Sequence, residues 1–463
     1  MDIYEMLFNS IAVLIKNVID NTDEDFFNRY SALGRGAREK INNMLETKFP
    51  ELFENRQPKE ILSAFLYDDA LFRRLYSLVQ EKPGEYDLQL IVSLLSKLDI
   101  CLSKRVEHYS TDKEIQGLNT NISESRIQLL PRCACSWEHN SRGANYCSDL
   151  SNYLKFFYYI ELDRLEGYDV RHIFLDSNVF SKATERRYLQ VGLSPLTDQG
   201  ELEWDADERE GVQYFYVTGV KNQDKLEQNM LSIMDKARTE EVDILCFPEM
   251  LGSWNLYNSA VNVLSSFPDG DDFYPPIVVL PSIWENQHNT SIVLDDCGND
   301  IIHQEKQHPY LFPDESSHEK YLEDLKPDKV IHLIHCKGIG RMAVMICKDA
   351  LMKSYLSIFL NILKVTLLLI PSFSTGHYAF QEIVESCKSA DCCACWINTC
   401  SVGRLAKVDT ENMDTIGMVL KSGKRSLMRN GIYPCERKRQ GCDAEGCGAP
   451  NCHDCLFIQK IQF

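Results

Sequence analysis

The sequence of 463 residues has no long apolar run, and we expect no secretory leader. Its longest apolar stretch, Leu356 to Pro371, is interrupted by Asn361 and Lys364 and is shorter than the roughly 20 residues that span a bilayer. The first ten residues carry Asp2 and Glu5 where a secretory signal carries lysine or arginine. We therefore expect a cytoplasmic protein with no membrane contact.

An excess of positive charge is also missing. The chain has 49 Lys and Arg residues against 68 Asp and Glu residues, a net charge of -19 that disfavours general nucleic-acid binding. Residues 421–440 are the exception, because they hold seven basic residues and one acidic residue, a local charge of +6 that leaves -25 for the rest. This segment is read first as a solvated loop, with an anionic ligand or a nucleic acid as the alternative partner.

The composition is that of a globular protein, with 44% hydrophobic, 25% charged and 10% aromatic residues. At roughly 150 residues per domain, the length predicts two or three domains. Eighteen cysteines in a chain of this length are too dilute for a small disulfide scaffold. They indicate a reducing compartment with buried thiols, a reactive thiol or a metal site.

Three segments differ in character along the chain. Residues 1–195 show apolar stripes at helical spacing, such as Ile3, Leu7 and Ile11, and predict a helical assembly or regulatory domain that contacts a protein partner. This region includes an aromatic helix expected at 150–165. Residues 196–210 are rich in acidic side chains and predict a solvated linker.

From residue 211 to 463 the sequence alternates between strand-like and helical segments, which predicts an α/β domain with mixed sheets. Three side chains in this part each follow a strand directly or within a few residues, namely Glu249, Lys306 and Cys347. Side chains beyond strand ends converge on shared clefts. A cysteine between a strand and a helix also faces helix N–H groups that stabilise a thiolate, so Cys347 is a candidate nucleophile. Asp349 is expected to cap the helix that follows.

The chain resembles the nitrilase, or carbon–nitrogen hydrolase, superfamily from about residue 212 to 401, with a final strand at 455–463. Four segments in the family's order carry the resemblance: a helix followed by DILCFPE, then EKQHPYLF, then MICKDAL, and finally VTLLLIPS with a helix and WINT. The resemblance implies a four-layer α-β-β-α sandwich, here preceded by the mainly helical N-terminal domain.

The resemblance also implies a reaction. Glu249 is expected to act as the general base for Cys347, which attacks an amide or nitrile carbon, while Lys306 stabilises the developing negative charge. No metal or organic cofactor is implied for catalysis. A second glutamate that orients the lysine is expected at Glu319, with Glu315 and Glu323 as the other candidates.

The family has an aromatic residue after the cysteine, where this chain has Lys348, which favours an anionic substrate. Family members commonly pair, so a homo-oligomer is expected. Nitrilase-like domains also occur in antiviral defence proteins, which makes defence one setting compatible with the resemblance.

Two alternatives stay open from the sequence. The chain has the composition for a Cys-His mechanism with His308 or His377, although neither residue has a local signature that ties it to Cys347. The second alternative is a nitrilase-fold scaffold that binds a ligand or partner without turnover.

A cysteine-rich insertion at 430–455 is a candidate structural zinc site, with a reduced cysteine-rich loop as the alternative. Its candidate ligands are Cys435, Cys442, Cys447, Cys452 and Cys455. A weaker candidate consists of Cys133, Cys135, His139 and Cys147. Cysteines between 387 and 400 lie on a predicted helix and strand and are expected to be core residues.

Overall fold

The computed structural model describes residues 3–61, 69–109, 117–138, 149–197, 202–266, 275–313, 319–374, 376–387, 390–399, 415–420, 432–434 and 456–463. The chain forms two compact units. The first consists of Met1–Glu166, Phe174–Asp176 and His335–Gly340, and the second of Gly167–Ile173, Ser177–Ile334 and Arg341–Phe463. Within the described residues, no helix is long and apolar enough to cross a membrane.

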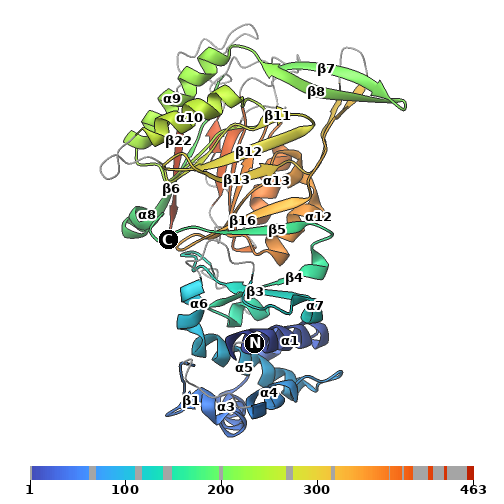
Figure 1. Cartoon of the computed structure of the whole chain (residues 1–463), viewed down its shortest axis with the longest axis vertical. Coiled ribbons are helices and arrows are strands. Elements are labelled where there is room, and N and C mark those ends of the chain that lie inside the picture. The colour runs from blue at the N-terminus through green and yellow to red at the C-terminus, as the bar shows by residue number, and fades with distance from the viewer. Residues whose placement is uncertain are drawn as a thin grey trace. The chain divides into compact units, whose positions relative to one another are not determined.

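The first unit is built mainly of helices (Figure 1). These are α1 (Ile3–Asn21), α2 (Phe26–Ser31), α3 (Arg35–Lys48), α4 (Asp69–Tyr76), α5 (Glu85–Cys101), α6 (Ser103–Tyr109) and α7 (Ile122–Ser125), with short turns η1 (Pro50–Leu52), η3 (Leu150–Tyr153) and η4 (Leu162–Arg164). Two antiparallel strand pairs complete it: β1 (Phe53–Glu54) with β2 (Gln57–Pro58), and β3 (Ile127–Pro131) with β4 (Phe157–Glu161).

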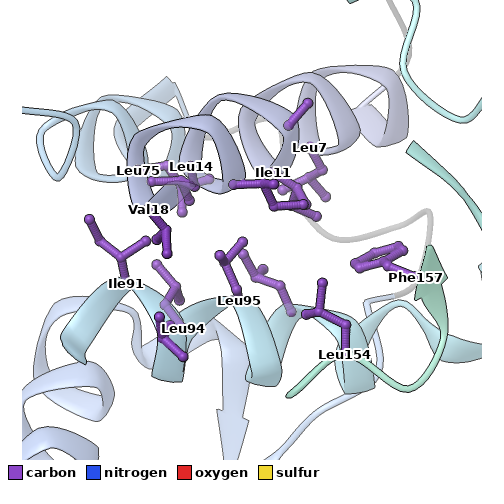
Figure 2. Packing of buried hydrophobic residues seen from close by; sticks show 14 of the residues in the cluster. Leu7, Ile11, Leu14, Val18, Leu75, Ile91, Leu94, Leu95, Leu154 and Phe157 are labelled. Atoms are coloured by element: carbon purple, nitrogen blue, oxygen red, sulfur yellow. The ribbon is translucent and has the colours of Figure 1, made fainter. Parts of the chain in front are cut away.

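The apolar stripe of α1 forms the centre of this unit's core. Figure 2 shows side chains of α1, among them Ile11 and Leu14, facing α5 side chains that include Ile91 and Leu95. These four side chains are at most 1% exposed. The helical periodicity of the first residues therefore predicts the packing face correctly.

The helix expected at 150–165 is wrong, because this segment contains strand β4 between two short turns. The buried carboxylate of Asp99 on α5 accepts the backbone N–H groups of Lys155, Phe156 and Phe157 at 2.7, 3.0 and 2.8 Å. A helix would need those N–H groups for its own hydrogen bonds. A contact distant in sequence thus overrides the local helical pattern.

The second unit contains three sheets (Figure 1). The first has the order β11-β12-β10-β9-β6-β22, with β13 paired to β12: β6 (Tyr188–Leu193), β9 (Ile244–Cys246), β10 (Ile277–Val279), β11 (Ile283–Glu285), β12 (His288–Asp295), β13 (Asp300–Glu305) and β22 (Phe457–Gln462). The second has the order β21-β20-β19-β18-β17-β16-β5: β5 (Asp169–Phe174), β16 (Val330–Cys336), β17 (Gly340–Val344), β18 (Leu367–Pro371), β19 (Cys393–Ile397), β20 (Thr415–Leu420) and β21 (Ile432–Pro434).

The third sheet, β14-β15-β8-β7, is smaller and consists of β7 (Leu202–Arg209), β8 (Val212–Val220), β14 (Leu311–Pro313) and β15 (Lys320–Glu323). The helices of this unit are α8 (Ser181–Arg186), α9 (Gln223–Thr239), α10 (Trp254–Ser265), α11 (Lys348–Leu351), α12 (Lys353–Ser357), η5 (Ile358–Ile362) and α13 (Tyr378–Cys387). The predicted alternation of strands and helices after residue 211 is confirmed, and so is the final strand at β22.

Helices cover both large sheets. Apolar side chains of α9 and α10 share one buried cluster with strands β9 and β10, while α13 packs on β19 and β20. The two sheets also contact each other, because the side chain of Gln304 on β13 donates to the carbonyl of Val330 on β16 at 3.1 Å. The strands that carry the candidate site are thereby held on both faces.

The acidic linker expected at 196–210 is wrong in part, because residues 202–209 form strand β7, which pairs with β8 over its whole length. The aromatic ring of Trp204 packs edge-on against Phe215 and Phe312 at 6.5 and 6.1 Å. The acidic side chains lie on an exposed edge strand, where charge discourages pairing with other chains. High charge alone therefore does not distinguish a linker from an edge strand.

The domain boundary expected at 195 also shifts. Strands β5 and β6 belong to the two large sheets of the second unit, and the division of the chain falls after Glu166. Strand β6 lies between β9 and β22, so its apolar side chains complete a sheet whose other strands come from much later in the sequence. A boundary read from local composition misses such long-range pairing.

Truncation of the α5 core side chain should destabilise the first unit. Leu95→Ala removes a side chain that is 0% exposed and is expected to lower the free energy of unfolding by about 2–5 kcal/mol. Ile100→Ala, on the same helix but 38% exposed, should cost less than about 1 kcal/mol. Urea unfolding followed by helical circular dichroism measures both, and equal losses would contradict the assigned packing.

Candidate active site

Three strand ends of the second unit bring Glu249, Lys306 and Cys347 into one buried cluster. Lys306 directly follows β13, while Glu249 and Cys347 each lie three residues beyond β9 and β17. The three residues are 1%, 1% and 5% exposed, respectively. The convergence predicted from their positions after strands is what the structure contains.

The ammonium group of Lys306 lies between two carboxylates. It donates to Glu249 Oε1 at 2.8 Å and to Glu323 Oε2 at 2.7 Å. Burial by itself lowers the pKa of Lys306, but the negative charges of the two glutamates outweigh burial and raise that pKa well above its ordinary value. Lys306 is therefore a fixed positive charge in the cluster.

The second glutamate is Glu323, and the expectation of Glu319 is wrong. Glu323 is 1% exposed and accepts from the backbone N–H of Tyr310 at 2.9 Å as well as from Lys306. Glu319 is exposed and accepts from the hydroxyl of Tyr321 at 2.7 Å. The third candidate, Glu315, lies outside the described residues.

Asn289 joins the two glutamates and was not anticipated from the sequence. Its Nδ2 donates to Glu249 Oε1 at 2.9 Å and more weakly to Glu323 Oε1 at 3.5 Å. Its carbonyl accepts from the backbone N–H of Lys306 at 2.8 Å, which continues the β12–β13 register. A β-bulge between Val293 and Leu294 shifts the register by one residue, so counting back from the turn would place Glu305 opposite Asn289, and the sequence alone does not signal the pairing with Lys306.

The carboxylate of Glu249 also contacts the thiol. It lies close enough to the Cys347 thiol to affect the pKa of that thiol, and the backbone N–H of Phe373 donates to Glu249 Oε2 at 2.9 Å. Burial first, and then the charge of Glu249, raise the pKa of the Cys347 thiol above its ordinary value, against the opposing effect of Lys306. The resting cysteine is therefore a thiol whose proton faces a carboxylate.

The sequence predicted a stabilised thiolate at a helix start, and this is wrong for the resting site. Helix α11 has only four residues, and its N-cap is Cys347 itself, so the dipole contribution is small against the cost of burial. The backbone of Cys347 has φ 47° and ψ -103°, a conformation that costs about 1–3 kcal/mol and is typical of functional positions. Its N–H donates to the carbonyl of Pro371 at 2.9 Å, which holds that conformation.

Asp349 supports the loop that follows Lys306 and does not cap α11 as expected. Its buried carboxylate accepts from the backbone N–H groups of Gln307 at 3.0 Å and His308 at 2.8 Å, and contacts His308 Nδ1 at 2.9 Å. Burial raises the pKa of Asp349, although these hydrogen bonds oppose the rise. His308 is thus paired with Asp349, while the carboxylate that affects the pKa of the Cys347 thiol is that of Glu249.

Most of the cysteine and histidine residues predicted as metal ligands lie outside the described residues. Cys435, Cys442, Cys447, Cys452 and Cys455 lie outside the described residues, as do His139 and Cys147. Cys133 is buried and Cys135 half-buried, and the buried thiols of Cys387, Cys392, Cys393 and Cys395 are core residues as predicted.

Within the described parts of the chain, one group of three side chains of the kind that bind metal ions lies close together. It consists of Asp295, Asp296 and Cys297, at the β12–β13 turn. There Asp295 Oδ1 already accepts the backbone N–H groups of Cys297 and Asn299 at 2.9 and 2.8 Å. This cluster is a hydrogen-bonded turn.

Comparison with known proteins finds no matching family model and no matching curated protein. Solved structures similar to this chain include Nit3 from Saccharomyces cerevisiae, a member of branch 10 of the nitrilase superfamily, at 14% identity over 60% of this chain and 90% of that one, with a TM-score of 0.39. An amidase variant from Nesterenkonia sp. AN1, with the acetamide moiety of fluoroacetamide added covalently at its active-site cysteine, matches at 10% identity over 59% and 90%, with a TM-score of 0.38.

A carbon–nitrogen hydrolase from Helicobacter pylori G27 is also similar, at 12% identity over 51% of this chain and 83% of that one, with a TM-score of 0.34. At these identities and TM-scores, the likenesses by themselves carry no conclusion about activity. The function proposed below therefore depends on the contacts of Glu249, Lys306, Glu323 and Cys347.

Removal of the central cation should destabilise the site. Lys306→Met leaves two buried carboxylates without their positive partner and is expected to lower the free energy of unfolding by about 3–5 kcal/mol. Lys320→Met removes an exposed lysine from β15 and should change it by less than about 1 kcal/mol. Urea unfolding compares the two variants, and an unchanged stability in Lys306→Met would contradict the buried ion cluster.

Proposed function

We propose that this chain is a thiol-dependent hydrolase of non-peptide carbon–nitrogen bonds, of the amidase or nitrilase type. The observation that carries the proposal is the buried contact of the Glu249 carboxylate with both the Cys347 thiol and the Lys306 ammonium. A nucleophile, a base in hydrogen-bond reach and a fixed positive charge are the three groups that acyl transfer requires.

In the first half of the reaction, Glu249 takes the thiol proton as the sulfur of Cys347 attacks the amide carbon. A carbon–sulfur bond forms, and the substrate oxygen gains negative charge beside Lys306 Nζ and the backbone N–H of Lys348. As the carbon–nitrogen bond breaks, Glu249 returns the proton to the leaving nitrogen. Ammonia or an amine departs and a thioester remains on Cys347.

In the second half, Glu249 takes a proton from water, whose oxygen attacks the thioester carbon. The carbon–sulfur bond then breaks, the proton returns to sulfur, and a carboxylic acid leaves. No step of this scheme requires a metal or an organic cofactor.

Two further residues are positioning groups in this proposal. Glu323 supplies the second carboxylate contact of Lys306, and Asp349 fixes the backbone that follows Lys306. Neither needs to touch the substrate. Both keep the ammonium within reach of the developing oxyanion.

The substrate side of the site has one unusual residue. Lys348 follows the nucleophile and is half-buried, and Tyr310 lies close enough for Cys347 and Lys306 to influence the pKa of its hydroxyl, which burial raises. A lysine at this wall favours an amide that carries a negative charge elsewhere in the molecule. The layers around the site are proposed to follow the α-β-β-α order of the nitrilase sandwich.

A second candidate is a binding protein of the same fold without turnover. Its support is the burial of Cys347, at 5% exposed, together with the raised pKa of its thiol. A thiol that stays protonated and out of contact with substrate would serve only as packing.

Alkylation by fluoroacetamide distinguishes the two candidates. In the hydrolase, the sulfur of Cys347 displaces fluoride, so intact mass spectrometry should show one carboxamidomethyl group. Cys347→Ala should lose this adduct, and Cys297→Ala, which removes an exposed thiol, should keep it. The same adduct in Cys347→Ala, or none in the unmodified chain, would favour the binding protein.

The identity of the second glutamate is testable by turnover. With an amide that the chain hydrolyses, Glu323→Gln should lower kcat by at least about tenfold, because the ammonium loses one of its two charged partners. Glu319→Gln changes an exposed carboxylate and should leave kcat within about twofold. Release of ammonia or amine is the readout, and the reverse order of effects would restore Glu319.

A further inference from the structure

A cleft of about 220 Å³ lies in the first unit, between helices α3 and α5. Its walls include the side chains of Arg38 and Asn42 from α3 and of Ser93, Ser96 and Lys97 from α5. The three α5 residues stand at spacings of three and four, so they share one face of that helix. The cleft is smaller than the roughly 300–1,000 Å³ of sites for drug-sized ligands, which limits an occupant to about one ring and one polar group.

The charge of this cleft is opposite to that of the chain. Among the described residues that line it, Arg38 and Lys97 carry positive charge and none is an aspartate or glutamate, in a protein with a net charge of -19. Two other arginines of the first unit are paired with carboxylates, since Arg29 pairs with Asp23 and Arg35 pairs with Glu39. Among the described residues, neither Arg38 nor Lys97 has a carboxylate partner in an ion pair, which leaves a local positive charge.

The guanidinium of Arg38 is held in place by backbone carbonyls. Its Nε donates to Leu33 at 2.9 Å and one terminal nitrogen donates to Ser31 at 2.7 Å. Guanidinium groups that are fixed in this way lose little conformational entropy when they bind an oxyanion. The remaining donors of Arg38 therefore form a prepared anion contact.

Hydroxyl groups and aromatic rings complete the lining. The Tyr30 hydroxyl and Ser93 Oγ lie 2.7 Å apart, and the rings of Tyr30 and Tyr153 meet edge-on at 5.1 Å. Leu33 and Ile41 supply an apolar wall beside them. One part of the cleft lining thus offers hydrogen-bond donors to an oxyanion, and another part offers a flat apolar surface.

We infer that this cleft binds a small ligand that carries a phosphate or carboxylate group on an aromatic or apolar ring, with Arg38 and Lys97 as the charged contacts. The site is separate from Cys347 and does not depend on the proposed hydrolase activity. It would give the N-terminal unit a ligand-binding role.

Calorimetric titration of the full chain tests this inference with phenyl phosphate, benzoate, inorganic phosphate and phenol. Phenyl phosphate or benzoate should bind at one site per chain, more tightly than inorganic phosphate and phenol, because only the ring-bearing anions use both parts of the lining. The better of the two probes identifies the oxyanion. Arg38→Gln and Lys97→Gln should each weaken binding by about tenfold or more, as expected for loss of a charge-assisted hydrogen bond.

The matched control is Arg35→Gln, one turn earlier on α3, where the side chain is 93% exposed and outside the cleft. It should leave the affinity unchanged. Circular dichroism verifies that each variant is folded. If Arg38→Gln unfolds, Lys97→Gln still tests the inference, because Lys97 is half-buried at the surface. Absence of saturable binding up to roughly 10 mM, or equal weakening by Arg35→Gln, would overturn the inference.

Discussion

A buried ammonium ion needs negative charge around it, and this requirement organises the second unit. Lys306 is 1% exposed, and its separation from water is compensated by Glu249 and Glu323 at 2.8 and 2.7 Å. Because the charge of Glu249 also affects the pKa of the Cys347 thiol, the ion cluster and the proposed nucleophile are electrostatically linked. Any change to one carboxylate therefore affects stability and chemistry together.

The fold produces this network by ending strands at the same place. Strands β9, β13 and β17 end next to Glu249, Lys306 and Cys347, and the backbone N–H of Glu249 donates to Ser372 O beyond β18 at 3.3 Å. The strained backbone of Cys347 is held by a further N–H bond to Pro371. The strand ends are rigid because helices pack against the sheets. The buried charges are therefore held at fixed distances from one another, as in a preorganised site for acyl transfer.

Local patterns were enough to predict the alternation of strands and helices after residue 211, the helical core around α1 and the convergence of Glu249, Lys306 and Cys347. They failed where contacts between residues distant in sequence determine the structure. Strand β7 was read as a linker because its acidic side chains face solvent, and the N-terminal boundary was misplaced because β5 and β6 pair with much later strands. Glu319 was preferred to Glu323 because nothing in the local sequence shows which carboxylate the fold turns inward.

The central claim is that Glu249 takes the proton of Cys347. The most direct measurement is the rate of Cys347 alkylation as a function of pH, in the unmodified chain and in Glu249→Gln. The account predicts that the glutamine variant reacts about 10²–10⁴-fold more slowly near neutral pH, and that its rate rises with pH as hydroxide, in place of Glu249, removes the thiol proton. Equal rates and identical pH profiles in the two proteins would contradict it.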